Sequence, residues 1–442
     1  MGWFMDYLPA WMFVVLFAML TLGFPVAFTI GALAIVFGLL GFGLTFFNLL
    51  PLRIWGVMQN FTLTAVPLFV FMGAVLERSG LAEELLETMA LLFGKLRGGL
   101  AISVVIVGAL LAASTGIVGA TVVTMGLLAL PTMLRRNYSP ELATGVIATS
   151  GTLGQIIPPS IVLVILSDIM QVSVGDLFMG AVFPGLLLVG LYLLYIVFLG
   201  FFKPESCPPV PEEERQAISP KELWLQVGSS LVPPMFLIVA VLGSILGGIA
   251  TPTEASAVGA AAAFALVALR KKFSMNMLRE VSVQTVRLTS MVFIILVGAN
   301  IFGLVFRGLG GDDIIREFIT HIPFGKWGVL VIIMVVLFLA GFFLDFIEIS
   351  FIHIPVLVPL MPLLGFDPVW FGVLVAVNLQ TSFLTPPFGY ALFYLKSVCP
   401  PGITTWTIYK GIVPFVFIQV IGLIIVALFP EIVLWLPRQV FG

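Results

Sequence analysis

Two apolar segments of the chain are each interrupted by a Pro-Pro pair that small polar residues precede. The first, residues 149–160, reads Thr-Ser-Gly-Thr-Leu-Gly-Gln-Ile-Ile-Pro-Pro-Ser, and the second, residues 378–389, reads Asn-Leu-Gln-Thr-Ser-Phe-Leu-Thr-Pro-Pro-Phe-Gly. Glycine and proline in the middle of an apolar run do not sustain a continuous helix. Unwinding frees backbone carbonyl oxygens, which together with hydroxyls suit a small hard cation, whereas helix N-termini favour an anion. Proline kinks that only repair the backbone are the alternative, but the matched pair of breaks favours a binding site.

Two longer apolar stretches, Gly99–Leu134 and Gly328–Leu364, exceed the length of one comfortable span and carry small or polar residues at their centres. We interpret both as re-entrant hairpins, which are tolerated where the tip is buried in protein or lines a cavity. Ser114, Thr115 and Gly116 fall at the midpoint of the first, where the backbone would reverse. A pair of short ordinary helices remains the alternative in each case.

The second stretch contains two carboxylates, Asp345 and Glu348, which are three residues apart and therefore neighbours on one helical face. An ionisable residue at membrane depth is costly and usually marks an ion or substrate path. The alternative is a carboxylate that reaches water or pairs with a nearby base. Asp345 is closer to the predicted turn, so we rank it above Glu348, and we interpret His353 as a packing residue. We find no obvious basic residue at membrane depth that would pair with an acidic substrate.

The composition indicates that lipid surrounds most of this chain. Of its 442 residues, 60% are hydrophobic and 10% are charged, whereas about 25% of the residues in soluble domains are charged. The net charge of −2 includes no basic stripe that would hold nucleic acid. The sequence contains no Walker-type loop and no cluster of His and Cys ligands, so we expect neither an enzyme nor a bound cofactor.

Apolar runs of bilayer-spanning length recur from end to end and predict an all-α integral membrane protein. One long polar segment, Lys203–Glu222, lies near the midpoint and has the composition of a solvated linker. Short amphipathic stretches at 81–93, 275–286 and 312–319 are predicted to lie in the membrane interface or to pack as connecting arms. The predicted spans are 8–21, 25–46, 63–76, 140–166, 177–202, 225–246, 255–269, 288–306, 368–395 and 408–429.

An internal repeat relates the two halves of the chain. Residues 138–159 align without a gap on residues 366–387, so the two Pro-Pro pairs are offset by 228 positions. Each half then holds about five spans and one hairpin, and an odd number of spans places the second half upside down. Inverted repeats with paired broken helices are typical of secondary transporters with a site at the midplane. The predicted division is a first repeat at 1–202 (hairpin about 99–134, broken helix about 140–168), a cytoplasmic linker at 203–224, and a second repeat at 225–442 (hairpin about 328–364, broken helix about 368–396).

Clustered basic residues predict the orientation in the membrane. Arg135-Arg136, Arg270–Lys272 and the linker all fall on one side of the predicted span count. Cytoplasmic loops carry an excess of Lys and Arg, so this side is assigned to the cytoplasm. Both termini are then expected to be periplasmic.

The whole chain resembles the large membrane subunit of tripartite ATP-independent periplasmic (TRAP) transporters. The residues that carry the resemblance are the Gly-Ile-Ala-Thr-Pro-Thr-Glu-Ala run at Gly248–Ala255, the reversal at Leu22–Ala27, the break at Ile157–Ser160, and the segments Phe343–Asp345 and Leu384–Pro387. The resemblance implies an elevator-type ion-transporter-like fold in a bacterial inner membrane. It also implies sodium-driven uptake of a small organic acid, such as a dicarboxylate, a keto acid or sialic acid, from a periplasmic substrate-binding protein. A small membrane subunit of four helices would be a separate partner.

The resemblance assigns site residues by motif position, with sodium as the coupling ion. One sodium would be surrounded by Ser114, Gly116, Ser150, Thr152 and Gly154, and the other by Gly341, Asp345, Asn378, Thr381 and Ser382. The organic acid would contact the hairpin tips and the breaks, at Thr115, Thr385, Pro158 and Pro386.

Two other functions compete with this one. A stand-alone sodium/dicarboxylate carrier would share the inverted repeats and hairpins but would need no binding protein. A membrane-embedded enzyme or scaffold subunit would show no ligand binding that depends on sodium.

Overall fold

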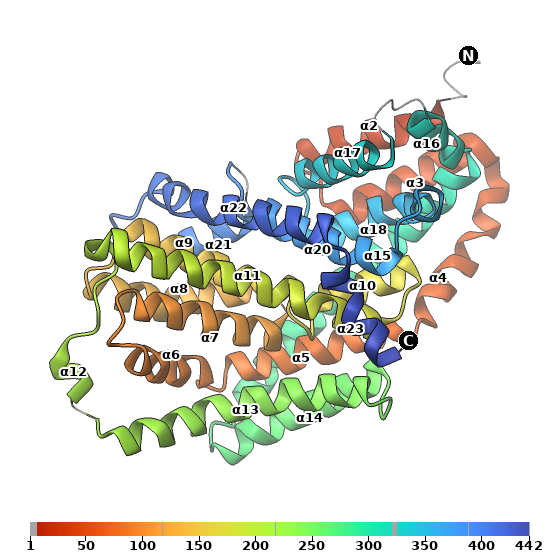
Figure 1. Ribbon diagram of the computed structural model, residues 1–442. Helices are drawn as coiled ribbons and strands as arrows, with labels where there is room; N and C mark the ends of the chain where they lie inside the picture. Colours follow the sequence, from red (N-terminus) through yellow and green to blue (C-terminus); the bar gives the residue numbers. More distant parts are fainter. Residues whose placement is uncertain (1–6, 117, 217, 321–324, 388, 442) are drawn as a thin grey trace.

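The computed structural model describes residues 7–116, 118–216, 218–320, 325–387 and 389–441, and within these ranges the regular structure is entirely helical. Long helices such as α11, α13, α14 and α22 run roughly parallel across the molecule (Figure 1). Seven of the described helices are long and apolar enough to cross a bilayer, and they lie at 26–48, 118–135, 174–202, 220–246, 252–269, 275–308 and 405–428. The chain is thus a multi-pass membrane protein, as its composition predicts.

The first half and the linker contain helices whose bounds agree closely with the predicted spans. They are α2 (Leu8–Thr21), α3 (Val26–Phe42), η1 (Gly43–Asn48), α4 (Leu50–Met58), η2 (Thr62–Thr64), α5 (Ala65–Glu77), α6 (Leu81–Leu92), α7 (Gly99–Thr115), α8 (Val118–Arg135), α9 (Pro140–Thr152), η3 (Leu153–Gln155), α10 (Ile161–Met170), α11 (Val174–Phe202), η4 (Pro204–Ser206) and α12 (Glu212–Gln216).

The second half follows the linker. Its helices are α13 (Pro220–Leu246), α14 (Pro252–Leu269), α15 (Met275–Gly308), α16 (Gly311–Thr320), α17 (Gly325–Ala340), α18 (Phe346–Leu357), α19 (Leu360–Leu364), α20 (Pro368–Leu384), α21 (Tyr390–Val398), α22 (Thr405–Leu428) and α23 (Glu431–Phe441).

Three elements differ from the sequence-based expectation. The amphipathic stretch 275–286 is not a separate arm but the first third of the 34-residue helix α15, because no glycine or proline interrupts residues 275–297. Residues 50–58 form the helix α4, which has Pro51 in its first turn, where proline is favoured. Helix α13 begins at Pro220, so the last residues of the predicted linker are helical.

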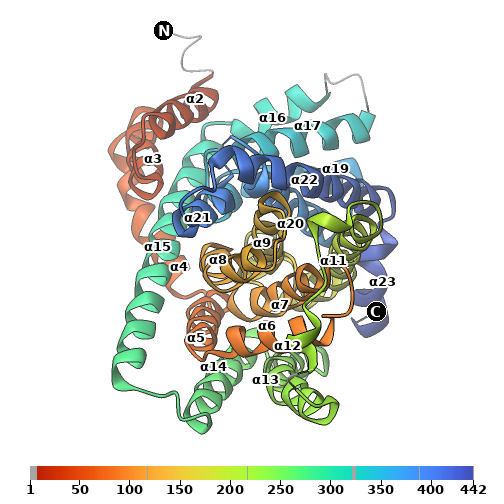
Figure 2. The ribbon, with the colours of Figure 1, turned by 90° about the vertical axis from the view of Figure 1, so that its left-hand side faces the viewer.

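Small residues position α9 at the centre of the molecule. Its sequence is rich in Ala, Gly, Ser and Thr, and every residue from Leu142 to Thr152 is buried. Small side chains let helices approach closely inside a membrane. Helix α9 accordingly packs against α7, α8, α20 and α22, and the end-on view of Figure 2 shows it among them. The first broken helix is therefore held on all sides by elements of both halves.

In each half, the helix that follows the break packs against the predicted hairpin of the other half. Helix α10, which follows the first break, packs against α18, the returning helix of the second predicted hairpin. Helix α21, which follows the second break, packs against α8, the returning helix of the first predicted hairpin. The turns and breaks of both halves therefore meet in one region.

Candidate functional site

A cavity of about 1090 Å³ lies where the turns of the two halves meet. Its walls come from α5 and α15, from the starts of α8, α10, α18 and α21, and from the end of α20. Gly116 and Asp345, one from each predicted hairpin turn, both line it. The fold thus brings two distant parts of the chain to one water-accessible space.

At the first break, the predicted ligands lie where α9 continues into the 3-10 turn η3. Ser150, Thr152 and Gly154 are buried there, and the end of α7 packs against them. The hydroxyls of Ser150 and Thr152 donate to carbonyls one turn earlier in their own helix, at 3.1 and 2.9 Å. A hydroxyl that donates in this way keeps its oxygen lone pairs. These oxygens can therefore serve as ligands for a hard cation.

At the second break, the same chemistry is present with an amide added. Asn378, Thr381 and Ser382 are buried in the last turns of α20. The hydroxyls of Thr381 and Ser382 donate to carbonyls of their own helix at 3.0 and 2.7 Å. The side-chain amide of Asn378 donates to the Met334 carbonyl of α17 at 2.8 Å, which ties the break to the second hairpin.

Each break also makes one very close approach to a hairpin. A Cβ atom added to Gly154 would lie 2.7 Å from the Ala112 carbonyl oxygen of α7. A Cβ atom on Gly341, at the end of α17, would collide with the hydroxyl of Ser382. Gly154 and Ser382 occupy matched positions of the 228-residue offset. Both contacts therefore need a glycine on one side, and each joins a break to the hairpin of its own half.

Asp345 and Glu348 are not neighbours on one helical face. Asp345 is the N-cap of α18, and its Oδ1 accepts a hydrogen bond from the Phe346 amide at 2.7 Å. Glu348, at the third position of α18, accepts from the Asp345 amide at 2.9 Å. The two form a capping box, because an acid three residues after an N-cap reaches back to its backbone N–H. One oxygen of Asp345 thus orients the helix, while the residue still lines the cavity.

One hydrogen bond joins the two breaks directly. The side-chain amide of Gln380 donates to the Thr152 hydroxyl at 3.3 Å, and both residues are fully buried. Their numbers differ by 228, so they are matched positions of the repeat. Sequence reasoning did not single out Gln380 or the fully buried Gln155. Both residues could have been found from the sequence, because each is a large polar side chain in a mostly apolar run at a break.

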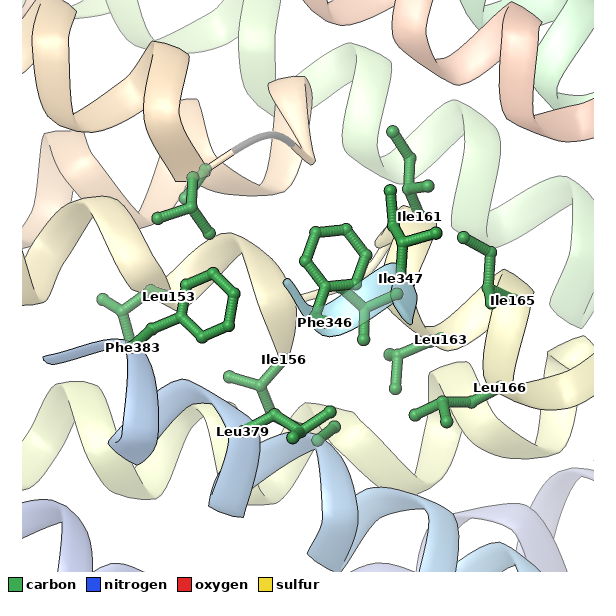
Figure 3. Close-up of a cluster of buried hydrophobic side chains, with 14 of the residues drawn as sticks. Leu153, Ile156, Ile161, Leu163, Ile165, Leu166, Phe346, Ile347, Leu379 and Phe383 are labelled. Carbon is green, nitrogen blue, oxygen red and sulfur yellow. The ribbon is translucent and has the colours of Figure 1, made fainter. Parts of the chain in front are cut away.

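Apolar side chains of both halves form a buried cluster beside the breaks (Figure 3). Leu153 and Phe383 come from the two breaks, and Ile161 and Phe346 from the starts of α10 and α18. The rings of Phe346 and Phe383 are 6.2 Å apart, centre to centre. Phe346, Phe383, Ile161 and Ile347 all contribute to the cavity wall. These four side chains form an apolar part of the cavity wall.

The structure brings the described ligands of each break together but does not expose all of them to the cavity. The side chains of Ser114 and Thr115 lie outside the described part of the chain. Among the described site residues, only Gly116 and Asp345 line the cavity. Thr385, Pro158 and Pro386 are described and are not part of its wall, with Thr385 donating to the carbonyl of Thr381 at 2.8 Å.

The cavity wall contains basic residues that the sequence analysis did not connect with the site. Three arginines line it, Arg78 directly after α5, and Arg279 and Arg287 on α15. Arg287 lies in α15 directly before its apolar part. The sequence analysis treated the amphipathic stretch and the span as separate helices, so it did not predict that Arg287 lies at the cavity.

Comparison with known proteins agrees with these features. The sequence model of the family described as "Tripartite ATP-independent periplasmic transporter, DctM component" matches residues 13–432. The chain belongs to this family. It is therefore a TRAP large permease subunit, a transport protein and not an enzyme.

Several TRAP permeases are similar over nearly their whole length. The C4-dicarboxylate TRAP transporter large permease protein DctM of Pseudomonas aeruginosa is 32% identical over 88% of this chain and 89% of its own. The sialic acid TRAP transporter large permease protein SiaM of Vibrio cholerae is 30% identical over 95% and 96% of the two chains. The ectoine TRAP transporter large permease protein TeaC of Halomonas elongata is 29% identical over 96% and 97%.

The fold also resembles that of solved transporters with little sequence similarity. The Alcanivorax borkumensis YdaH transporter superposes with a TM-score of 0.63 at 14% identity, over 97% of this chain and 98% of that chain. Neisseria gonorrhoeae MtrF superposes with a TM-score of 0.59, also at 14% identity, over 88% and 84%. This TRAP permease subunit therefore shares their all-helical transporter architecture.

Proposed function

We propose that this chain is the translocating subunit of a sodium-coupled uptake system for a small organic acid. The observation that carries the proposal is the matched pair of breaks, each rich in hydroxyl and carbonyl oxygens and each held against a hairpin turn. Paired broken helices at a midplane are where secondary transporters bind substrate and coupling ions. Hard oxygens without a cluster of soft ligands are the donor set that suits sodium rather than a transition metal.

We infer that the sodium ligands are the residues named for the two breaks. The first set is Ser114, Gly116, Ser150, Thr152 and Gly154, and the second is Gly341, Asp345, Asn378, Thr381 and Ser382. The carboxylate of Asp345 would supply the one formal negative charge in these sets. Its Oδ1 accepts the capping hydrogen bond from the Phe346 amide, and the residue lines the cavity.

The substrate class and partners rest on the family. Two relatives are described as permeases for C4-dicarboxylates and for sialic acid, and both cargoes are organic acids. TRAP large permeases work with a small membrane subunit and a periplasmic binding protein, so we propose both as partners in a bacterial inner membrane. The two halves at 1–202 and 225–442 would be inverted repeats, and the hairpins and broken helices would slide together as an elevator.

Reconstitution in liposomes tests this function. The large permease, the small subunit and the binding protein are combined, and uptake of succinate and of sialic acid is followed with an inward sodium gradient. We expect uptake only when all three proteins and sodium are present. Uptake that is equal under a potassium gradient contradicts sodium coupling.

The same assay tests the alternative that this chain is a stand-alone carrier. Liposomes that contain the large permease alone, with no binding protein, should then take up the acid under the sodium gradient. That result would replace the binding-protein-dependent mechanism with a carrier that collects its own substrate.

A further inference from the structure

The first part of α15 presents a polar face to the cavity. Asn276, Glu280, Gln284 and Arg287 follow one another at intervals of four, four and three residues, which places them on one helical face. All four line the cavity, as does Arg279. The next cavity residues along this helix are the apolar Leu288, Met291 and Val292. Arg287 is thus the innermost charged residue that α15 contributes.

The acidic residues of α5 and α15 that face the cavity already have partners. Glu280 forms an ion pair with Arg78 at 2.8 Å. Glu77 accepts a hydrogen bond from the Thr124 hydroxyl of α8 at 3.0 Å.

The carboxylates of α18 are engaged as well, since Asp345 and Glu348 form the capping box at its start. Arg279 and Arg287, by contrast, form no ion pair or side-chain hydrogen bond with any residue in the described ranges. Two exposed arginines of one helix therefore line the cavity without an ion-pair partner among the described residues.

The position of Arg287 along α15 gives it a different role from Arg279. At 1.5 Å per residue, Arg287 lies about 18 Å from the start of α15 at Met275, and Arg279 about 6 Å. Arg287 is exposed at the cavity, and the α15 residues that follow it in the cavity wall are apolar, so an anion that enters the cavity can reach its guanidinium group. Arg287 has Met291 one turn further in and shares the cavity with Asp345 and Gly116. It is therefore the cation best placed to meet an anion at the hairpin turns.

We propose that Arg287 is a carboxylate-binding residue of this transporter, and that Arg279 only attracts anions toward it. This inference rests on the proposed function, because it names a residue that would recognise the organic acid. A guanidinium group binds a carboxylate through two parallel hydrogen bonds, and a lysine does not reproduce this geometry. Helix α15 carries none of the predicted sodium ligands, so substrate charge and sodium would be held by different walls of the cavity.

The test compares Arg287→Gln and Arg287→Lys with Arg279→Gln as the matched control on the same helix. Sodium-driven uptake of succinate and of sialic acid is measured in the complete reconstituted system, at a range of acid and sodium concentrations. Arg287→Gln is expected to raise the acid concentration for half-maximal uptake about tenfold or more, since a hydrogen bond to a charged group is lost. Arg287→Lys should fall between Arg287→Gln and the unmodified protein, and Arg279→Gln should change the value less than about threefold. The sodium concentration for half-maximal uptake should stay the same in all three variants.

The outcomes separate this inference from the proposed function. If the unmodified protein shows no sodium-driven uptake, the proposed function fails. If the unmodified protein transports the acid and Arg287→Gln has the same half-maximal acid concentration, the carboxylate-binding role is overturned. Equal effects of Arg287→Gln and Arg279→Gln would overturn it too, because they would indicate general attraction of anions.

Lipid headgroups are a second source of anionic ligands for an arginine near a membrane surface. The assay is therefore run in liposomes of phosphatidylcholine alone and in liposomes with added phosphatidylglycerol. An effect of Arg287→Gln in both supports binding of the substrate carboxylate. An effect that appears only with phosphatidylglycerol overturns the proposal in favour of a lipid phosphate site.

Discussion

At the scale of single residues, the two breaks contain hydroxyl groups whose hydrogens already form hydrogen bonds. Ser150, Thr152, Thr381 and Ser382 each donate to a carbonyl of their own helix. This arrangement fixes the hydroxyl and points its oxygen lone pairs elsewhere. The Thr152 oxygen also accepts a hydrogen bond from the Gln380 side chain, so a cation would share that oxygen with Gln380.

Removing one such oxygen should weaken sodium coupling. Ser150→Ala is expected to raise the sodium concentration for half-maximal uptake by about tenfold, equivalent to about 1.4 kcal/mol. Ser103→Ala is the matched control, because Ser103 is also buried and also donates to a helix carbonyl, at 2.8 Å, but lies near the start of α7. If both variants shift the sodium dependence equally, the assignment of Ser150 is wrong.

Asp345 caps α18 and is proposed to bind sodium, and one substitution can separate these two roles. Asparagine is as good an N-cap as aspartate, so Asp345→Asn should retain the start of α18 while removing the negative charge. We expect unchanged thermal unfolding of the purified protein and a loss of sodium-dependent uptake. Asp345→Ala removes the cap as well and should lower stability by about 1 kcal/mol. Normal sodium dependence in Asp345→Asn would exclude its carboxylate as a ligand.

At the scale of elements, the Thr-Pro-Thr-Glu-Ala run has a clear structural role. Thr251 and Glu254 form a capping box at the start of α14. The Thr253 hydroxyl donates to the Phe61 carbonyl at 3.0 Å. The run therefore starts one helix and supports the connection between α4 and α5.

That connection reaches the first broken helix. Asn60 donates to the Asp168 carboxylate near the end of α10 at 2.6 Å. Its own side-chain oxygen accepts from the backbone of Thr62 and Leu63, which fixes its orientation. A hydrogen bond to a charged group contributes about 1.5–3 kcal/mol. The pair is a contact between the α4–α5 connection and α10 that sequence analysis did not anticipate.

Breaking this pair should loosen α10. Asn60→Ala is expected to destabilise the protein by about 1.5–3 kcal/mol, measured by thermal or denaturant unfolding in detergent. Asn48→Ala serves as the control, because Asn48 is exposed at the end of η1. Equal stability of the two variants would contradict a stabilising role for the bond.

At the scale of the whole molecule, charged groups at the helix ends hold the basic side together. Arg136 pairs with Glu214 of α12 at 2.5 Å, and Arg270 pairs with Glu84 of α6 at 2.6 Å. Figure 1 shows α12 at the left edge and α23 on the right. The basic loops and the C-terminal helix thus lie at opposite ends of the long helices.

The predicted orientation can be tested with single cysteines in a chain without Cys207 and Cys399. Both test positions, Glu213 in α12 and Gln439 in α23, are exposed. A membrane-impermeant maleimide should label Gln439→Cys in spheroplasts and Glu213→Cys only in inverted vesicles, since the basic side is expected in the cytoplasm. The reverse pattern would invert the topology, and labelling of both from one side would contradict the separation of these helices.

Local sequence pattern was enough to predict where helices form and where they break. Apolar length predicted α2 at Leu8–Thr21, and proline with glycine predicted the breaks after Thr152 and Leu384. Tertiary structure decided which side chains meet. The Gln380–Thr152 and Asn60–Asp168 hydrogen bonds join residues that are far apart in the sequence, and no local pattern predicts them. The position of Arg287 at the cavity could not be predicted from the residues around it either. Periodicity and composition report the environment of one helix, whereas a binding site is made where several helices converge, and packing alone sets that convergence.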